Sequence, residues 1–377
     1  MKKSLKNNTC KAVYIHIPFC STICSYCDFC KMYYNSNIAF KYLSILFSEI
    51  KSNYNNEIIN SIYIGGGTPS VLSNAQLEKL LAITKIFNTK NLEFTVEVNI
   101  ENIDIAKLNL LKKYGVNRIS VGIQTVNSKH IKFLNRKHNK EMVLEKIKLI
   151  QTFFENINVD LMYALYSETI EELKDDLKFY LSLGVKHISA YSLIIEPHTK
   201  LYNMKTKYID EDLDFLMYDT ICKTLKKSGY KHYEVSNFSQ DGYFSLHNLT
   251  YWNNSEYYGF GLGACGYVNG IRYENTRNLT KYLNGNYVKE SHKLSINETI
   301  ENEFILGLRK INGISILKFL EKYNFNPLDI DIVKELLKEK FLVIKNNYIK
   351  INKQYIYQQN NILYRFLSVD YSKYCKL

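Results

Sequence analysis

The chain has 377 residues, of which 46% are hydrophobic and 23% charged, as in ordinary globular proteins. These values argue against a disordered chain, a collagen-like fibre and a small domain that depends on disulfides. The net charge of +12 permits an anionic partner. The basic residues are spread along the chain without a run of five or six, so we read the charge as compositional and expect no nucleic-acid partner.

The first two-thirds of the chain alternates short β-rich runs with amphipathic helical patterns. Runs rich in Val, Ile and Tyr predict six strands, at 12–17, 61–64, 93–98, 118–122, 158–162 and 187–193. Helical patterns lie between them, and Ser73 with Gln76 predicts a capping box before the helix at 74–87. Strands that are each followed by a helix predict an α/β fold with a parallel sheet, here an incomplete (β/α)6 barrel. In such barrels the chemistry lies at the carboxyl ends of the strands.

The last third of the chain has a different pattern. A helix is expected near 211–228, and residues 230–275 are rich in Tyr and Gly. Helical patterns at 298–309, 315–322 and 330–339 precede two strand-like runs, at 341–345 and 348–352, which resembles a winged helix. We therefore expect a barrel over 1–230, an aromatic segment packed on it over 231–290, and a mainly helical, winged-helix-like domain over 291–377.

Four of the eight cysteines lie within eleven residues: Cys20, Cys24, Cys27 and Cys30. The first eleven residues are polar and no apolar run is long enough for a membrane span, so we expect a cytoplasmic, reducing location. There a tight cysteine cluster more often binds metal than forms disulfides. Three thiolates leave one iron of a four-iron cluster open, whereas four fill a zinc site or a complete cluster. An iron–sulfur cluster, zinc and free thiols all remain open from the residues alone.

The segment from Tyr14 to Asp28 carries the spacing C-x3-C-x2-C with an aromatic residue before the third cysteine. This pattern resembles the radical S-adenosylmethionine (radical SAM) enzymes. The resemblance extends over nearly the whole chain, for example at 65–70, 115–124 and 247–252, and within the superfamily it is to the HemW group of the coproporphyrinogen III oxidase-like branch. It implies a partial barrel with a [4Fe-4S] cluster on Cys20, Cys24 and Cys27, and SAM as a second cofactor.

The resemblance also implies which side chains contact SAM. Glycines after a strand allow close approach of the backbone to a ligand, and acidic side chains at strand ends suit an ammonium group or a ribose hydroxyl. Taken alone, Glu97 and Asp160 are read first as helix caps or solvated side chains, while the alternatives for the glycines and Arg136 are a turn without a ligand and a surface charge. The expected set is Tyr14, Gly66, Gly67, Thr68, Glu97, Gln124, Arg136 and Asp160.

The run His247-Asn-Leu-Thr-Tyr251-Trp252 matches the HNxxYW motif of the HemW group. The resemblance implies that His247 ligates heme, which is reasonable because imidazole binds heme iron; without it, His247 reads as a hydrogen-bonded core residue. The implied task is heme delivery, with heme or a porphyrin as partner, an acceptor protein, an electron donor and room for a peripheral membrane contact. The alternatives are an oxygen-independent coproporphyrinogen III oxidase and a zinc-containing nucleic-acid-binding protein.

Three positions depart from the pattern of the family. Relatives usually have Gly-Leu-Pro-Gly-Gln-Thr after the fifth strand, where this chain has Ala164-Leu-Tyr-Ser-Glu-Thr169. They also have histidine where this chain has Cys265, which we expect to be inert rather than a heme ligand. Cys30 is an additional cysteine, and Phe29 stands where the oxidases have their fourth cysteine, which favours the HemW group.

Overall fold

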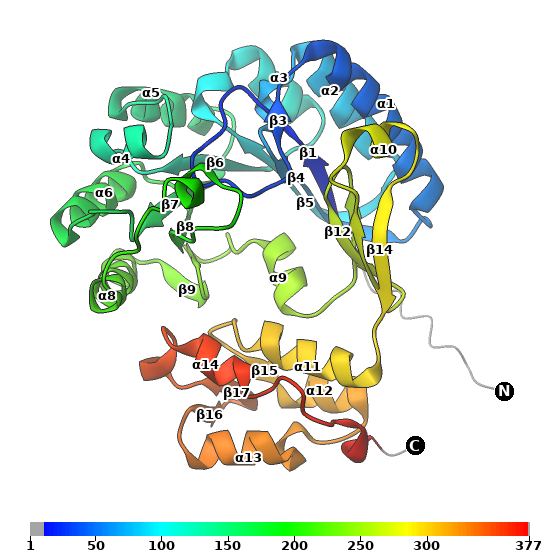
Figure 1. The fold of residues 1–377 in the computed structure, drawn as a ribbon, viewed down its shortest axis with the longest axis vertical. Coiled ribbons are helices and arrows are strands. Elements are labelled where there is room, and N and C mark those ends of the chain that lie inside the picture. The colour runs from blue at the N-terminus through cyan, green and yellow to red at the C-terminus, as the bar shows by residue number, and fades with distance from the viewer. Residues whose placement is uncertain (1–10, 376–377) are drawn as a thin grey trace.

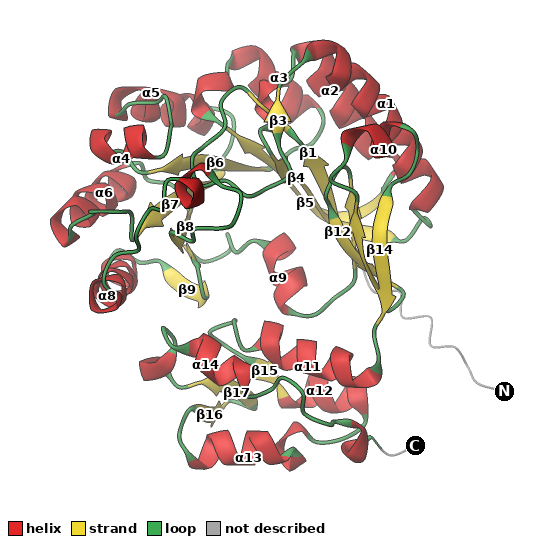
Figure 2. Ribbon diagram, viewed as in Figure 1, coloured by secondary structure: helices red, strands yellow, loops and turns green. Residues whose placement is uncertain are grey.

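The computed structural model describes residues 11–375. A long curved sheet dominates the fold, and helices cover its outer face (Figures 1 and 2). Six parallel strands lie side by side in chain order at its centre. They are β1 (Lys11–Ile17), β4 (Ile58–Gly66), β5 (Asn88–Val98), β6 (Arg118–Gln124), β7 (Asn156–Tyr163) and β8 (His187–Ser192). The predicted α/β fold with a partial (β/α)6 barrel is confirmed.

Helices return the chain between these strands, as right-handed crossovers require. They are α1 (Ser36–Asn53), α2 (Asn74–Ile83), α3 (Ile105–Lys113), α4 (Ser128–Phe133), α5 (Lys140–Gln151) and α6 (Ile170–Ser182), with α7 (Lys200–Asn203) and α8 (Glu211–Lys227) after β8. Side-chain caps define their starts. The predicted capping box between Ser73 and Gln76 is present, and a second joins Thr169 to Glu172.

Residues 231–290, which we expected to pack on the barrel, extend the same sheet at both of its edges. β9 (Lys231–Glu234) and β10 (Asn237–Ser239) join antiparallel beside β8. β11 (Tyr257–Phe260) pairs in parallel with β1, and β12 (Cys265–Val268), β13 (Ile271–Asn275) and β14 (Val288–Lys293) follow antiparallel. Two short helices belong to this region, α9 (Leu246–Trp252) and α10 (Leu279–Leu283).

The C-terminal residues form a small domain with the order of elements of a winged helix. Its elements are α11 (Ile296–Gly307), β15 (Ile314–Ser315), α12 (Ile316–Tyr323), α13 (Asp331–Lys338), β16 (Leu342–Lys345), β17 (Tyr348–Ile351) and α14 (Gln359–Tyr364). The three strands form their own sheet in the order β15-β17-β16. In Figure 1 this domain lies across the open side of the barrel, with α9 between the two.

The apolar core is divided in the same way. One large cluster fills the space between the curved sheet and its helices, and a separate cluster, from Ile300 to Tyr371, fills the C-terminal domain. The inner face of the barrel instead carries buried polar side chains such as Ser61, Thr95 and Asn158. No helix within residues 11–375 is both long and apolar enough to cross a membrane.

Candidate active site

The cysteine loop begins where β1 ends. Backbone hydrogen bonds fix it to the end of β4, since Gly67 N donates to Ile17 O and Thr68 N to Phe19 O, each at 2.8 Å. A short parallel pair, β2 (Phe19–Cys20) with β3 (Met32–Tyr33), closes the base of the loop. The loop is therefore held at the carboxyl ends of the parallel strands, where barrels carry their chemistry.

Cys20, Cys24 and Cys27 all line one pocket at this end of the barrel. Burial raises the pKa of the Cys20 thiol, and it raises the pKa of Cys27 to about 12 although the Lys31 ammonium opposes the shift. Without metal the Cys20 and Cys27 thiols keep their protons, whereas bound iron removes the proton from a coordinating thiol outright. Donors already face two of the sulfurs: Thr68 Oγ1 lies 3.7 Å from Cys20 Sγ, and Arg136 Nη1 lies 3.5 Å from Cys24 Sγ.

Cys30 stands apart from these three cysteines. It does not line the pocket, and its side chain lies against Gly263, where an added Cβ would come within 2.7 Å of Cys30 Cβ. Within residues 11–375, no three Cys, His, Asp or Glu side chains are close enough together to hold one metal ion. A single zinc ion would need such a set, whereas a four-iron cluster takes each thiolate on a different iron. The donor set of Cys20, Cys24 and Cys27 therefore fits an iron–sulfur cluster better than zinc.

Close packing of the backbone requires glycine at positions 66 and 67, in addition to the expected contact with SAM. A Cβ on Gly66 would lie 2.5 Å from the His16 ring, and one on Gly67 would lie 2.8 Å from the carbonyl oxygen of Phe19. Gly66 also has a φ of +113°, which favours glycine. The glycines thus let the end of β4 approach the cysteine loop closely, while Gly66, Gly67 and Thr68 still line the pocket.

Two half-buried acidic residues, Glu97 on β5 and Asp160 on β7, face the same pocket. Glu97 accepts hydrogen bonds from Tyr63 Oη at 2.7 Å and from Gly66 N at 2.9 Å, and Asp160 accepts one from Asn158 Nδ2 at 2.8 Å. Burial raises the pKa of Glu97 to about 7 and that of Asp160 to about 6. A cationic ligand would favour their ionised forms. Such a pair suits SAM, which carries an ammonium and a sulfonium group.

The ends of β6 and α4 complete the pocket. Gln124 lines it with a φ of 78°, a conformation that non-glycine residues rarely adopt. Arg136 donates to Asn99 Oδ1 and to the Gly122 carbonyl, while its Nε is buried without a partner. An unpartnered donor on a pocket wall is available to an acceptor on a ligand.

Seven of the eight residues expected at SAM line this one pocket: Gly66, Gly67, Thr68, Glu97, Gln124, Arg136 and Asp160. Tyr14 does not line it; its hydroxyl is hydrogen-bonded to His16 Nδ1 at 2.9 Å, and His16 in turn is hydrogen-bonded to the Cys30 carbonyl. Asn99 lines the pocket but was not expected. The alternation of side chains along a strand indicates this position, because Asn99 lies two residues beyond Glu97 and therefore on the same face.

His247 is not part of this pocket and is closed off from solvent. It is 1% exposed, its Nδ1 is hydrogen-bonded to Ser61 Oγ at 2.8 Å and its Nε2 to Tyr251 Oη at 2.7 Å. Its ring also stacks on Tyr63 with the centroids 5.0 Å apart. Burial lowers its pKa to about 3, so the imidazole is neutral. In this conformation neither ring nitrogen is free to bind a heme iron.

The residues around His247 close the barrel at the end opposite the pocket, which we call the floor. The first N–H groups of α9 donate to Glu93, from Leu246 N at 3.0 Å and His247 N at 2.9 Å. The other end of α9 reaches the C-terminal domain, where the Arg309 guanidinium lies 5.8 Å from the Trp252 ring centroid and Asn254 donates to Thr299 O. This helix therefore joins the barrel to the C-terminal domain. Cys265, the other residue considered for heme, is exposed at the start of β12.

The altered loop after β7 keeps a glycine-like backbone without glycine. Ala164 has a φ of 60° and Ser167 a φ of 59°, at the two positions where the family pattern has glycine. Glu168, where the family pattern has Gln, is buried and accepts a hydrogen bond from Leu165 N at 2.9 Å, while its Oε1 has no partner within residues 11–375. Burial raises the pKa of Glu168 to about 8.

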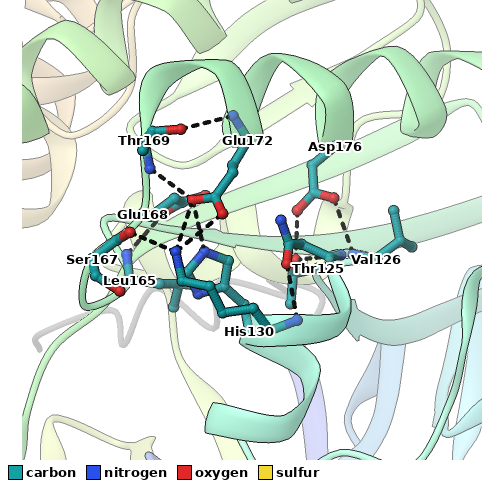
Figure 3. A network of polar contacts seen from close by, with 11 residues as sticks. Thr125, Val126, His130, Leu165, Ser167, Glu168, Thr169, Glu172 and Asp176 are labelled. Carbon is teal, nitrogen blue, oxygen red and sulfur yellow. Dashed lines mark hydrogen bonds and ion pairs between the residues drawn. The ribbon is translucent and has the colours of Figure 1, made fainter.

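Figure 3 shows two carboxylates of α6, the helix that follows the loop: Glu172 contacts the loop itself, and Asp176 contacts the segment after β6. Glu172 caps its own helix through Thr169 and contacts His130 Nε2 at 3.2 Å. Asp176 accepts hydrogen bonds from Thr125 Oγ1 at 2.6 Å and Val126 N at 3.1 Å. The loop and the residues that follow Gln124 are thus held together beside the pocket.

The comparisons with known proteins agree with this geometry. A model of the radical SAM superfamily matches residues 14–180. The solved structure of coproporphyrinogen III oxidase (HemN) from Escherichia coli superposes with a TM-score of 0.84, covering 97% of this chain and 92% of that chain at 20% identity, which shows a shared fold. The fold and the cysteine pocket thus define a radical SAM barrel, and membership of this superfamily implies a [4Fe-4S] cluster and SAM.

Two curated relatives make the assignment narrower. Heme chaperone HemW of Lactococcus lactis is 40% identical over 371 residues, covering 95% of this chain and 98% of that protein. Heme chaperone HemW of Bacillus subtilis is 37% identical over 351 residues, with 88% and 92% covered. The chain belongs to the HemW family of radical SAM proteins.

Proposed function

We propose that Cys20, Cys24 and Cys27 hold a [4Fe-4S] cluster and that SAM binds beside it in the same pocket. The observation that carries this proposal is the convergence of three cysteines from one loop with seven expected SAM contacts from five other segments of the chain. Glu97 and Asp160 would face the cationic groups of SAM, and the free Nε of Arg136 would donate to one of its oxygens. When bound, the cluster supplies an open iron for SAM and the electron that radical chemistry needs.

We propose further that the protein carries heme as cargo and delivers it to acceptor proteins. Support comes from the HemW relatives, whose name describes them as heme chaperones and which match this chain over nearly its whole length. The same proposal includes a protein that accepts the heme, an electron donor for the cluster and a peripheral contact with the membrane.

Heme ligation by His247 would require a rearrangement of the barrel floor. Both ring nitrogens are engaged, so Tyr251 or Ser61 has to move before iron can bind. Each hydrogen bond lost in this way costs about 1 kcal/mol net, which the bond to iron would have to offset. We therefore propose that a heme-loaded form differs from the present one in the position of α9.

One preparation tests both proposals. Full-length protein, reconstituted anaerobically with iron and sulfide, should hold about four irons per chain and should bind SAM and heme. Zinc without iron would overturn the cofactor proposal. Turnover of coproporphyrinogen III with SAM and a reductant would overturn the chaperone proposal in favour of the oxidase, whereas heme binding without such turnover supports it.

A further inference from the structure

Arg118 is a charged side chain inside the barrel that the proposed cofactor contacts do not use. It begins β6 and is 2% exposed. Alternate residues of a strand share a face, so Arg118 lies on the same face as Ser120 and Gly122, and Gly122 lines the SAM pocket. Gly122 is the fourth residue after Arg118, which is about 13 Å along an extended strand. Arg118 therefore lies beneath the pocket, between it and the floor of the barrel.

The guanidinium of Arg118 has no carboxylate partner. Its Nε is buried without a hydrogen bond, and no ion pair within residues 11–375 includes it. The nearby carboxylates are bound to other donors: Glu93 to the first N–H groups of α9, Glu97 to Tyr63 and Gly66, and Asp160 to Asn158. An unpaired charge in such surroundings is poorly screened and acts on other groups at longer range.

Several ionisable groups lie within reach of this charge. On the pocket side, Arg118 lowers the pKa of Glu97 and Asp160 and so opposes the larger effect of their burial. On Asp160 it acts more strongly than Arg136, which lines the pocket itself. On the floor side, burial first and Arg118 second lower the pKa of His187 and His247. The charge of Arg118 thus favours anions above it and neutral imidazoles below it.

We propose that Arg118 is a positioning residue for SAM: its unpaired charge favours the ionised forms of Glu97 and Asp160, which are the forms that bind a cationic ligand. This inference rests on the proposed SAM site. The groups that face Glu97 come from five elements, namely Tyr14 on β1, Tyr63 on β4, Arg118 on β6, Asp160 on β7 and Tyr251 on α9. Among them only Arg118 is a cation. Arginine is suited to this role because its guanidinium keeps its charge even when buried.

The test is the pH dependence of SAM binding by the full-length, cluster-loaded protein, measured by equilibrium dialysis. In the wild type the affinity should fall as the pH drops through about 7, where Glu97 takes up a proton. In Arg118→Gln the midpoint should move up by about one pH unit, so that SAM binds about fivefold more weakly at pH 7 and with nearly wild-type affinity at pH 9. Arg118→Lys keeps a positive charge at this position and should therefore bind SAM at pH 7 with wild-type affinity.

Two further variants separate this effect from a general loss of structure. Arg272→Gln removes a cation on β13 that packs on the Tyr267 ring, and should leave the profile unchanged. Arg118→Met is a second neutral variant should Arg118→Gln fail to fold. An equal loss of affinity at every pH, or an unchanged midpoint in both neutral variants, would overturn the role of Arg118. A wild-type protein that holds the cluster but binds no SAM would instead overturn the proposed cofactor site.

Discussion

The two ends of the barrel interior differ in whether their polar side chains face a pocket. At the carboxyl ends of the strands, Arg136 keeps a free Nε, Gln124 holds a rarely adopted backbone conformation, and two carboxyl groups have pKa values near neutrality. At the floor, His247 has partners on both ring nitrogens and Glu93 accepts two backbone N–H groups. The upper end is built to receive a ligand, whereas the floor is closed by the protein itself.

This difference separates two motifs that the sequence presents alike. The C-x3-C-x2-C run and the HNxxYW run both read as ligand motifs, but only the first faces a pocket. The second begins with a histidine that joins α9 to β4 and ends beside contacts with the C-terminal domain. A motif of this kind can act as a structural latch, as a ligand site that opens, or as both, and substitutions at each end of the barrel distinguish these roles.

The largest effect is expected at the cysteines. Replacing Cys24 by alanine removes one of three thiolates, and we expect loss of the cluster together with its iron and of SAM binding. Cys30→Ala is the matched control, because Cys30 contributes only its backbone carbonyl to His16 and does not line the pocket. It should keep about four irons per chain. Iron and sulfide analysis decides the matter, and equal loss in both variants would contradict the assignment of three ligands.

At the floor, His247→Ala should destabilise the fold by about 2–4 kcal/mol, because it leaves a cavity and removes the partners of Ser61 and Tyr251. Tyr251→Phe removes one hydrogen bond and should cost about 1 kcal/mol. Urea unfolding followed by the fluorescence of Trp252, the only tryptophan, measures both.

Heme titration of the same two variants sharpens this comparison. If His247 becomes a ligand when α9 opens, its removal should change the spectrum of bound heme, while Tyr251→Phe should preserve the spectrum and bind heme more readily. An altered heme spectrum in His247→Ala without any loss of stability would argue against a closed floor.

The pocket was predictable from the sequence because its signals are local. Apolar runs rich in Val and Ile predicted the six parallel strands of the barrel, and parallel order brings their carboxyl ends together whatever the details of packing. Glu97 and Asp160 follow from their positions near strand ends. Tyr14 is the exception. It shares a strand face with His16, two residues on, and the two side chains bind each other.

The floor was not predictable, since it depends on contacts between distant segments. The sequence does not indicate that β11 pairs with β1 or that β10 pairs with β8, because exposed edges accept any strand of suitable shape. His247 is hydrogen-bonded to Ser61, which lies 186 residues away in the sequence, and to Tyr251, which lies one helical turn further along α9. A histidine among aromatic residues has the same sequence signature whether its nitrogens are free or bonded.

The rim beside the pocket offers an effect of similar size that depends on pH. The pKa of Glu168 rises from 4.5 to about 8 on burial. Between these values the folded chain holds one proton more than the unfolded chain, so this group lowers the free energy of unfolding as the pH rises from about 4.5 to about 8. Glu168→Gln, the family residue, should remove this decline and so gain about 3–4 kcal/mol at pH 8 relative to pH 5, because each pH unit in this range is worth about 1.4 kcal/mol.

Thermal unfolding at a series of pH values measures the effect of Glu168. Glu171→Gln is the matched control, since Glu171 is exposed in the first turn of α6, and it should leave the pH dependence as in the wild type. If Glu168→Gln retains the full decline, the carboxyl group is satisfied in the folded chain by a donor other than Leu165.

The smallest effect concerns the backbone of the same loop. Ser167 is exposed and has a φ of 59°, so Ser167→Gly should relieve strain and stabilise the fold by about 0.5–1 kcal/mol. Ala164→Gly relieves similar strain but removes a buried methyl group, which is worth about 0.8 kcal/mol, so we expect a change near zero. Ala82→Gly, on the exposed side of α2, should destabilise the fold by about 0.5–1 kcal/mol. Chemical denaturation of the three variants orders them, and a destabilising Ser167→Gly would mean that the hydroxyl, and not the backbone, holds this rim beside the pocket.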